Sequence, residues 1–174
     1  MAEGATRLII LDTNALITLL TKDKDEAEYK NLVAFLNQGK SFSIALPMPA
    51  ISEFIAGDDN EARSLSLLKP NSKFKNLDFD AKAALSAAKV YREYRNLPKN
   101  RKSQDPRQKV KVDIQIIGIA LANNATAIIS HDQGLKKVVN ELDLDITVYD
   151  YMDNNYFEQM AGVTVVESPK NQLS

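Results

Sequence analysis

The sequence has no cysteine among its 174 residues. Disulfides, thiolate nucleophiles and cysteine-based zinc or iron–sulfur sites are therefore excluded. His131 is the single histidine, so imidazole catalysis would depend wholly on it, and a packing or hydrogen-bonding role suits it better. No apolar run approaches the roughly 20 residues of a membrane span, and the first residues lack the pattern of a signal peptide. We expect a cytoplasmic protein that is neither secreted nor inserted in a membrane.

Several motifs of common enzymes are also missing. The sequence has no glycine-rich phosphate loop, no HExxH metal motif and no nucleotide-binding fingerprint. Its composition is ordinary, since 44% of the residues are hydrophobic and 26% are charged, as in globular domains. A chain of this length matches roughly one domain. We expect residues 1–150 to form that domain and residues 151–174 to form a C-terminal extension that ends in a loose tail.

Short apolar runs alternate with helical patterns along the chain. The expected strands are residues 8–11, 42–46, 74–79, 126–130 and 146–149, and the first runs into a turn at residues 12–14. The expected helices are residues 26–38, 50–56, 81–94, 112–123 and 135–142, with one more that ends near Leu68. Asp80 is the expected N-cap of the long helix, and Asp58, Asp59 or Asn60 that of the helix ending near Leu68. Residues 98–108 are expected to form an exposed loop. The alternation predicts an α/β domain with a mostly parallel central sheet flanked by helices.

Charge is distributed unevenly, although the formal net charge is only −1. Residues 99–111 contain six basic side chains and one acid, so this segment carries +5 and the rest of the chain −6. Such a patch indicates an anionic partner, and the alternatives are a solvated loop or a loop that docks the acidic C-terminal segment. The basic side chains of this patch are Lys99, Arg101, Lys102, Arg107, Lys109 and Lys111.

Two expected strands run into an aspartate. Asp12 follows the first apolar run, and Asp132 follows the run that ends at Ser130 and His131. Ligands of open parallel sheets bind beyond the carboxyl ends of the strands, so both acids are expected to face one crevice. Each could instead be a turn former or a helix N-cap, which is the commoner role of an aspartate after a strand.

Two further acids lie within apolar helical patterns. Asp113 shares a helical face with Ile116 and Ile117, so its carboxylate is expected to point partly inward. A buried carboxylate must be neutralised, hydrogen-bonded, paired or bound to a metal, although an acid near a helix N-terminus is also favoured by the helix dipole. Glu53 is the only charge within residues 50–56, and alone it would be the polar side of an amphipathic turn.

Together the four acids indicate a metal site. Carboxylates that converge on one crevice repel each other unless cations intervene, and ligation by oxygen alone suits Mg²⁺ or Mn²⁺ rather than zinc. One or two such ions can activate water and stabilise the charge that develops during in-line attack on a phosphodiester. We therefore expect a catalytic metal site at Asp12, Glu53, Asp113 and Asp132.

Four segments resemble, in order, the acidic motifs of PIN-domain nucleases, and they look most like the VapC-type toxins of toxin–antitoxin systems. The segments are LIILDTNAL at residues 8–16, PAISEF at 49–54, VDIQIIGIA at 112–120 and AIISHD at 127–132. The resemblance implies a PIN-like three-layer sandwich with the four acids around Mg²⁺ or Mn²⁺. It also implies that Thr13, Asn14 and Ser130 form a polar shell that orients acids or water.

The same resemblance implies an endoribonuclease with RNA as its substrate. For a toxin it also implies an antitoxin protein as a partner, and the chain itself is a candidate homodimer. The positive patch at residues 99–111 would hold the RNA backbone, because the acids themselves repel it. The chain departs from compact toxins of this type in its extended basic loop and in its acidic segment after Tyr149.

Two other functions remain as alternatives. A non-catalytic PIN-fold protein that binds RNA or acts as a scaffold is the main one, and the retained set of four acids argues against it. A haloacid-dehalogenase-like phosphotransferase also places an aspartate after its first strand, but its chemistry needs a second aspartate two residues later. That position is Asn14 here.

Overall fold

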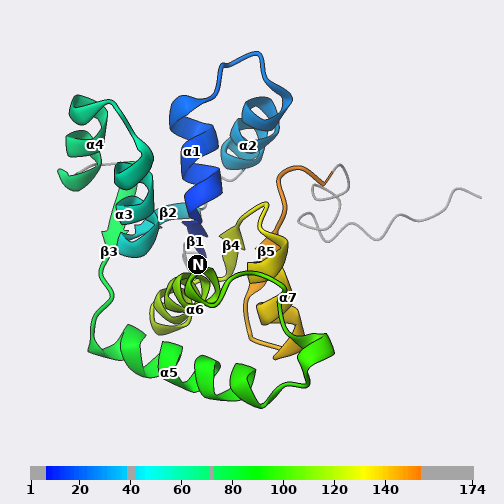
Figure 1. Ribbon diagram of the computed structural model, residues 1–174. Helices are drawn as coiled ribbons and strands as arrows, with labels where there is room; N and C mark the ends of the chain where they lie inside the picture. The colour runs from blue at the N-terminus through cyan, green and yellow to red at the C-terminus, as the bar shows by residue number, and fades with distance from the viewer. Residues whose placement is uncertain (1–6, 39–41, 71–72, 154–174) are drawn as a thin grey trace, which may run out of the picture.

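The structure is a computed structural model that describes residues 7–38, 42–70 and 73–153. Five parallel strands form one sheet in the order β3-β2-β1-β4-β5 (Figure 1). Their bounds are Arg7–Leu11 for β1, Phe42–Pro47 for β2, Phe74–Leu77 for β3, Ala127–Ile129 for β4 and Thr147–Tyr149 for β5. All five strands were expected from the sequence, and the predicted parallel α/β fold is confirmed.

Helices cover both faces of this sheet. Their bounds are Thr13–Thr21 for α1, Ala27–Gln38 for α2, Met48–Gly57 for α3, Glu61–Leu68 for α4, Ala81–Asn96 for α5, Arg107–Ala122 for α6 and Gln133–Glu141 for α7. Successive residues of a strand point to opposite faces. In β1, Ile10 packs with residues of α5, α6 and α7, whereas Ile9 and Leu11 pack with residues of α1, α2 and α3. The chain is therefore a three-layer sandwich with the sheet buried on both sides (Figure 1).

All six predicted helices are present, with boundaries that differ at a few places. The helix ending at Leu68 is capped by Asn60, one of the three expected candidates, and Asp80 caps α5 as predicted. The turn expected at residues 12–14 is instead the start of α1, because Asp12 accepts a hydrogen bond from the Thr13 amide and caps this helix. The turn-forming residues at 12–14 therefore begin a helix, α1, that the sequence pattern did not indicate.

The expected exposed loop at residues 98–108 is shorter than predicted. It holds a 3₁₀ turn at Lys99–Arg101, and α6 begins at Arg107, five residues before the predicted start. Pro106 is the N-cap residue, and its carbonyl oxygen accepts from the Val110 amide over 3.2 Å at the start of the helix. Arg107, Lys109 and Lys111 therefore lie on α6 rather than in a loop, and Asp113 lies in the second turn of that helix.

Close packing of α5 against α6 fixes the direction of α6. A Cβ atom on Gly118 would lie 2.6 Å from Ala87 Cβ and 2.8 Å from the carbonyl oxygen of Ala83. Only glycine lets the two helix backbones approach this closely. The contact holds α6 against the sheet with Asp113 turned toward the carboxyl ends of the strands.

Most of the C-terminal extension expected at residues 151–174 lies outside the described residues, which end at Asp153. The tail expected from residue 168 onward lies outside the described residues. Among the residues that are described, no helix is both long and apolar enough to span a membrane.

Candidate functional site

One pocket of about 310 Å³ is lined by all four acids named from the sequence. Asp12 reaches it from the end of β1, and Asp132 from the segment after β4. Glu53 comes from α3, and Asp113 from α6. Because the strands are parallel, the ends of β1 and β4 meet at one edge of the sheet, and the flanking helices bring the other two acids to that edge.

Asp12 is buried, with 4% of its surface exposed. Its Oδ1 accepts from the Thr13 amide over 2.7 Å, and its Oδ2 accepts from the Ser130 hydroxyl over 2.7 Å. Burial raises the pKa of Asp12 to about 6, although these two hydrogen bonds oppose the shift. The nearby charges of Asp132 and Glu53 also raise this pKa. Asp12 is thus both the N-cap of α1 and a buried acid that a cation would stabilise.

Asp113 is the least satisfied acid of the pocket. It is 5% exposed, and its Oδ2 is buried without a hydrogen-bond partner. Burial raises its pKa to about 7, and the charge of Lys109, 3.7 Å from Oδ2, opposes that shift. A buried carboxylate oxygen without a hydrogen bond is costly, and a bound cation or proton would stabilise it.

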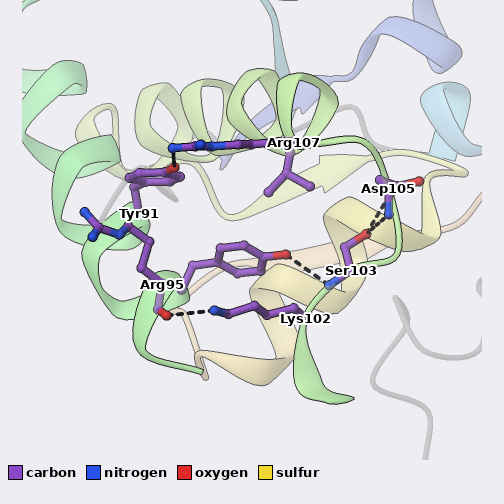
Figure 2. Close-up of a pocket in the computed structure, with 8 residues that line it drawn as sticks. Tyr91, Arg95, Lys102, Ser103, Asp105 and Arg107 are labelled. Carbon is purple, nitrogen blue, oxygen red and sulfur yellow. Dashed lines mark hydrogen bonds between the residues drawn. The ribbon is translucent and has the colours of Figure 1, made fainter. Parts of the chain in front are cut away.

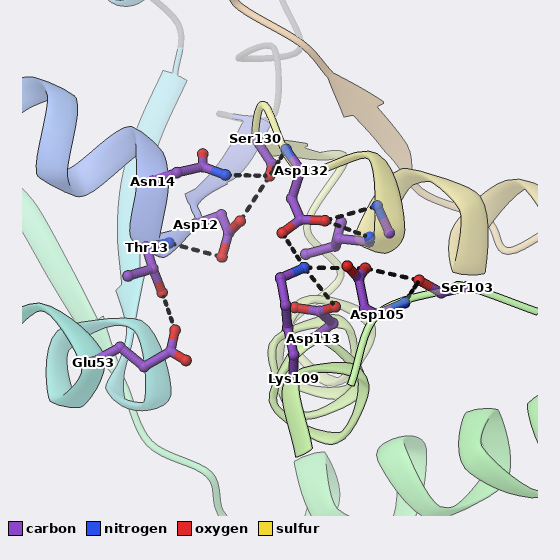
Figure 3. A network of polar contacts seen from close by, with 12 residues as sticks. Asp12, Thr13, Asn14, Glu53, Ser103, Asp105, Lys109, Asp113, Ser130 and Asp132 are labelled. Atoms are coloured by element: carbon purple, nitrogen blue, oxygen red, sulfur yellow. Dashed lines mark hydrogen bonds and ion pairs between the residues drawn. The ribbon is translucent and has the colours of Figure 1, made fainter. Parts of the chain in front are cut away.

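Lys109 lies among three carboxylates. Its Nζ is 3.2 Å from Asp105 Oδ2 and 3.7 Å from Asp113 Oδ2, and it also forms an ion pair with Asp132 Oδ2. Oxygens of these three acids lie within 4.8 Å of one another, the spacing of a metal cluster (Figure 3). Burial alone would lower the pKa of Lys109, but its carboxylate partners raise it above the ordinary lysine value. The cluster therefore already contains one cation.

Asp105 is a site residue that sequence analysis missed. It is the lone acid of the basic segment, yet Asp105, Lys109 and Asp113 are spaced four residues apart, with Asp105 just before α6 and the other two on one face of that helix. That spacing was the available signal, but the predicted start of the helix at residue 112 hid it. Gly134 makes room for Asp105, because a Cβ at this position would overlap the Asp105 carboxylate.

Glu53 and Asp132 occupy different surroundings. Glu53 is exposed, and its Oε2 accepts a hydrogen bond from the Thr13 hydroxyl over 2.5 Å. Asp132 caps α7, since its Oδ1 accepts from the amides of Gly134 and Leu135. Its Oδ2 points instead to Lys109. Asp132 therefore combines the capping role with a place in the acidic cluster.

The residues expected to orient the acids do make such contacts. Ser130 donates its hydroxyl to Asp12 and accepts from the Asp132 amide over 2.9 Å, so one hydroxyl joins two acids. Asn14 Nδ2 also donates to this hydroxyl over 3.4 Å, and Asn14 Oδ1 accepts from the His131 amide. The His131 ring lies 2.8 Å from an oxygen of Asp150, consistent with the hydrogen-bonding role expected of it.

The basic patch is divided among several partners. Arg101 forms an ion pair with Glu141, and Lys109 binds the acids of the pocket. Lys102 donates to the Arg95 carbonyl over 2.7 Å, and Arg107 donates to the Tyr91 hydroxyl over 3.3 Å. Lys99 and Lys111 are exposed. The positive patch expected from the sequence is thus reduced, because two of its six members, Arg101 and Lys109, are neutralised by acids.

The donor set fits a divalent cation. Every ionisable group of the pocket except Lys109 is a carboxylate, and the oxygens of Asp105, Asp113 and Asp132 converge. Oxygen ligands suit hard cations such as Mg²⁺ and Mn²⁺. The buried Asp113 Oδ2, which has no hydrogen bond, is a ligand atom that such an ion would satisfy.

Comparison with known proteins gives one family. The sequence profile of the PIN domain matches residues 9–141 of the chain. No curated protein matches the sequence significantly.

Solved structures of similar fold include toxin complexes. VapBC-1 from nontypeable Haemophilus influenzae superposes with a TM-score of 0.58 and 19% identity, over 84% of this chain and 99% of that one. A toxin–antitoxin complex from Klebsiella pneumoniae gives a TM-score of 0.56 and 14% identity, over 83% and 98%. VapC20 from Mycobacterium tuberculosis, a toxin that cleaves the sarcin-ricin loop, gives 0.53 and 8%, over 73% and 92%. At these identities the likeness shows a shared fold.

Proposed function

This chain belongs to the PIN-domain family, and from that membership together with its acidic pocket we propose that it is a metal-dependent endoribonuclease. One observation carries the proposal. The buried Oδ2 of Asp113 has no hydrogen bond, and it lies in a pocket that three other acids line. An arrangement of this kind is costly for folding, so it is expected where an ion or substrate compensates for the cost.

In this function Asp12, Glu53, Asp113 and Asp132 hold Mg²⁺ or Mn²⁺, and Asp105 supports the cluster from the segment before α6. When bound, the ion supplies the positive charge that activates water and stabilises the phosphodiester during attack. Ser130 and Thr13 keep Asp12 ionised and oriented through their hydrogen bonds. Glu53 is the exposed acid, so its carboxylate can accept a proton from water that enters the pocket.

The test is cleavage of single-stranded RNA by the purified protein, with DNA of the same sequence as a second substrate. We expect cleavage of the RNA with Mg²⁺ or Mn²⁺ and none after chelation, because without the ion the acids of the pocket repel the phosphodiester. Asp12→Asn and Asp113→Asn should each lower the rate by roughly 10²-fold or more. Asp145→Asn is the matched control, since this exposed acid precedes β5 and so lies at the amino ends of the strands, away from the pocket. Undiminished cleavage in chelator would contradict the proposal.

A non-catalytic PIN-fold RNA-binding or scaffold protein is the second candidate, and the position of Lys109 favours it. An ammonium group already balances three of the acids, as in a structural ion-pair network. This candidate predicts RNA binding without cleavage at any metal concentration. It also predicts that Mn²⁺ leaves the melting temperature unchanged, whereas a metal enzyme is stabilised by its ion.

We propose further that the nuclease serves as the toxin of a toxin–antitoxin pair. The support is its fold, which it shares with the toxin of the Klebsiella pneumoniae complex. Induced expression in bacteria should arrest growth, and the Asp113→Asn variant should not. Co-expression of a protein encoded by the adjacent reading frame should restore growth if that protein is the antitoxin. Arrest by wild type and variant alike would contradict the toxin role.

A further inference from the structure

A second pocket of about 340 Å³ lies beside the acidic one, between α5, the start of α6 and the segment that joins them (Figure 2). Its walls include Tyr91, Tyr94, Arg95, Lys102, Ser103 and Arg107. Asp105 also lines it and is at the same time a member of the acidic cluster. The two pockets share no lining residue, but they meet at the ion pair between Asp105, which lines the second pocket, and Lys109, which lines the acidic one.

The lining of this second pocket is cationic. Arg95, Lys102 and Arg107 contribute three positive charges, and Asp105 is the only acid. Asp105 is turned to other partners, since its Oδ2 accepts from the Ser103 hydroxyl over 2.7 Å and pairs with Lys109. Arg95 and Arg107 are exposed, and no described residue forms a hydrogen bond or ion pair with the Arg95 guanidinium. The pocket therefore offers two guanidinium groups to an anion.

Two phenol rings accompany these cations. Tyr94 is buried, and its hydroxyl accepts from the Ser103 amide over 3.0 Å, while Lys102 Nζ lies 5.9 Å above its ring. Tyr91 is half-buried, and its hydroxyl accepts from Arg107. Both rings are thus fixed by contacts with the residues around them. A fixed aromatic ring next to arginine side chains suits a ligand that combines a planar base with a phosphate.

We propose that this pocket binds one nucleotide of the RNA strand. This nucleotide belongs to the part of the strand that runs from the cleaved bond toward α5. The base stacks on Tyr91, and its phosphate pairs with Arg95 and Arg107. The ion pair between Asp105 and Lys109, where the two pockets meet, places this nucleotide next to the part of the strand that lies over the acids. The inference rests on the proposed nuclease function and assigns part of its substrate site.

The first experiment measures RNA affinity in the Asp12→Asn background, where the strand stays intact. A labelled single-stranded RNA of roughly 15 nucleotides is titrated at several salt concentrations. Changing both Arg95 and Arg107 to Ala should weaken binding by about tenfold and lower the salt slope by about 0.7, the value for the one phosphate that the two side chains hold together. Arg92→Ala removes the same charge from an exposed position of α5 outside the pocket, and it should change affinity less than about twofold.

A second experiment tests base stacking on the Tyr91 ring. Tyr91→Leu should weaken binding by about tenfold without changing the salt slope, because stacking releases no counterions, and Tyr91→Phe should restore most of the affinity. Adenosine monophosphate should displace the RNA at a lower concentration than inorganic phosphate does. Equal competition by inorganic phosphate would identify a simple anion site and overturn the nucleotide assignment.

Cleavage by the protein with unchanged Asp12 separates the two proposals. If RNA is cleaved but the arginine and tyrosine variants keep the affinity and salt slope of the parent, the nucleotide pocket is wrong and the nuclease stands. If no RNA is cleaved while these variants still lose affinity as predicted, the pocket binds RNA and the nuclease function is wrong.

Discussion

The ammonium group of Lys109 lies 3.7 Å from Oδ2 of Asp113, one helical turn away on α6. This is the only cation within 4.0 Å of that oxygen among the described residues. The same ammonium contacts Asp105 and Asp132, so it stands where the three carboxylates converge. A divalent ion that uses these carboxylates must therefore compete with Lys109.

Lys109→Met should accordingly strengthen metal binding. Removing the ammonium leaves the carboxylates to repel one another, so we expect the Kd for Mn²⁺ to fall by about tenfold and the metal-free protein to melt at a lower temperature. Titration calorimetry and thermal melts with and without Mn²⁺ measure both effects. Lys111→Met, on the exposed side of the same helix, is the control and should change neither. Weaker Mn²⁺ binding by Lys109→Met would mean that Lys109 assists the ion.

Metal-free stability should depend on the protonation of Asp113. Its pKa is raised to about 7 in the folded chain, whereas the ordinary value is 3.8. Between these values the folded state binds more protons than the unfolded state, so stability falls as pH rises from about 4 to 7. Between pH 5 and pH 8 in chelator, the free energy of unfolding of the wild type should fall by on the order of 2 kcal/mol more than that of Asp113→Asn.

The same protonation opposes metal binding, because an ion requires the charged carboxylate. Mn²⁺ should therefore bind more tightly at pH 8 than at pH 5 and release protons as it binds. Urea denaturation across this pH range, with and without Mn²⁺, measures both effects. Equal pH dependence in wild type and Asp113→Asn would show that Asp113 is ionised throughout the range.

Much of the fold was predictable because the strands are buried on both faces. Residues 8–11 form a continuous apolar run, and Ile9, Ile10 and Leu11 are at most 1% exposed. The four acids could also be named, since each interrupts an apolar pattern or ends a strand. The meeting of Asp12 and Asp132 follows from the parallel pairing of β1 and β4, which strand alternation already indicated, whereas Glu53 and Asp113 reach the pocket from α3 and α6.

The rest depended on contacts between distant segments. Asp105 looked like one acid in a basic loop, and only the early start of α6 and the missing side chain of Gly134 bring it into the cluster. The sequence groups Lys109 with the positive patch at residues 99–111, because its neighbours along the chain are basic. Its actual partners lie up to 23 positions away, at Asp132. Local charge patterns cannot show such pairing.

Gly118→Ala should destabilise the fold. In an exposed helix this change stabilises by up to about 1 kcal/mol, because alanine has the higher helix propensity. Here the new Cβ would meet Ala87 Cβ at 2.6 Å and backbone atoms of α5 at 2.8 Å, so we expect a loss of about 1–3 kcal/mol. Gly57→Ala is the control, since nothing lies within 4 Å of its Cβ position. Urea denaturation should show that Gly118→Ala lowers the free energy of unfolding and that Gly57→Ala raises it.

Ser130→Ala tests whether the polar shell controls the metal site. The change removes the donor to Asp12 Oδ2 and the acceptor of the Asp132 amide, while the strand before it is untouched. Loss of the hydrogen bond to Asp12 should raise the pKa of this acid further, since that bond now opposes the effect of burial. Removal of groups that orient metal ligands typically lowers metal affinity by 10–100-fold, so we expect Mn²⁺ binding to weaken by about tenfold at pH 7.

The loss of Mn²⁺ affinity in Ser130→Ala should shrink at higher pH, where Asp12 is ionised again. Ser66→Ala, on the exposed side of α4, is the control and should leave the Kd unchanged. A deficit that stays the same at every pH would mean that Ser130 positions Asp12 without affecting its proton.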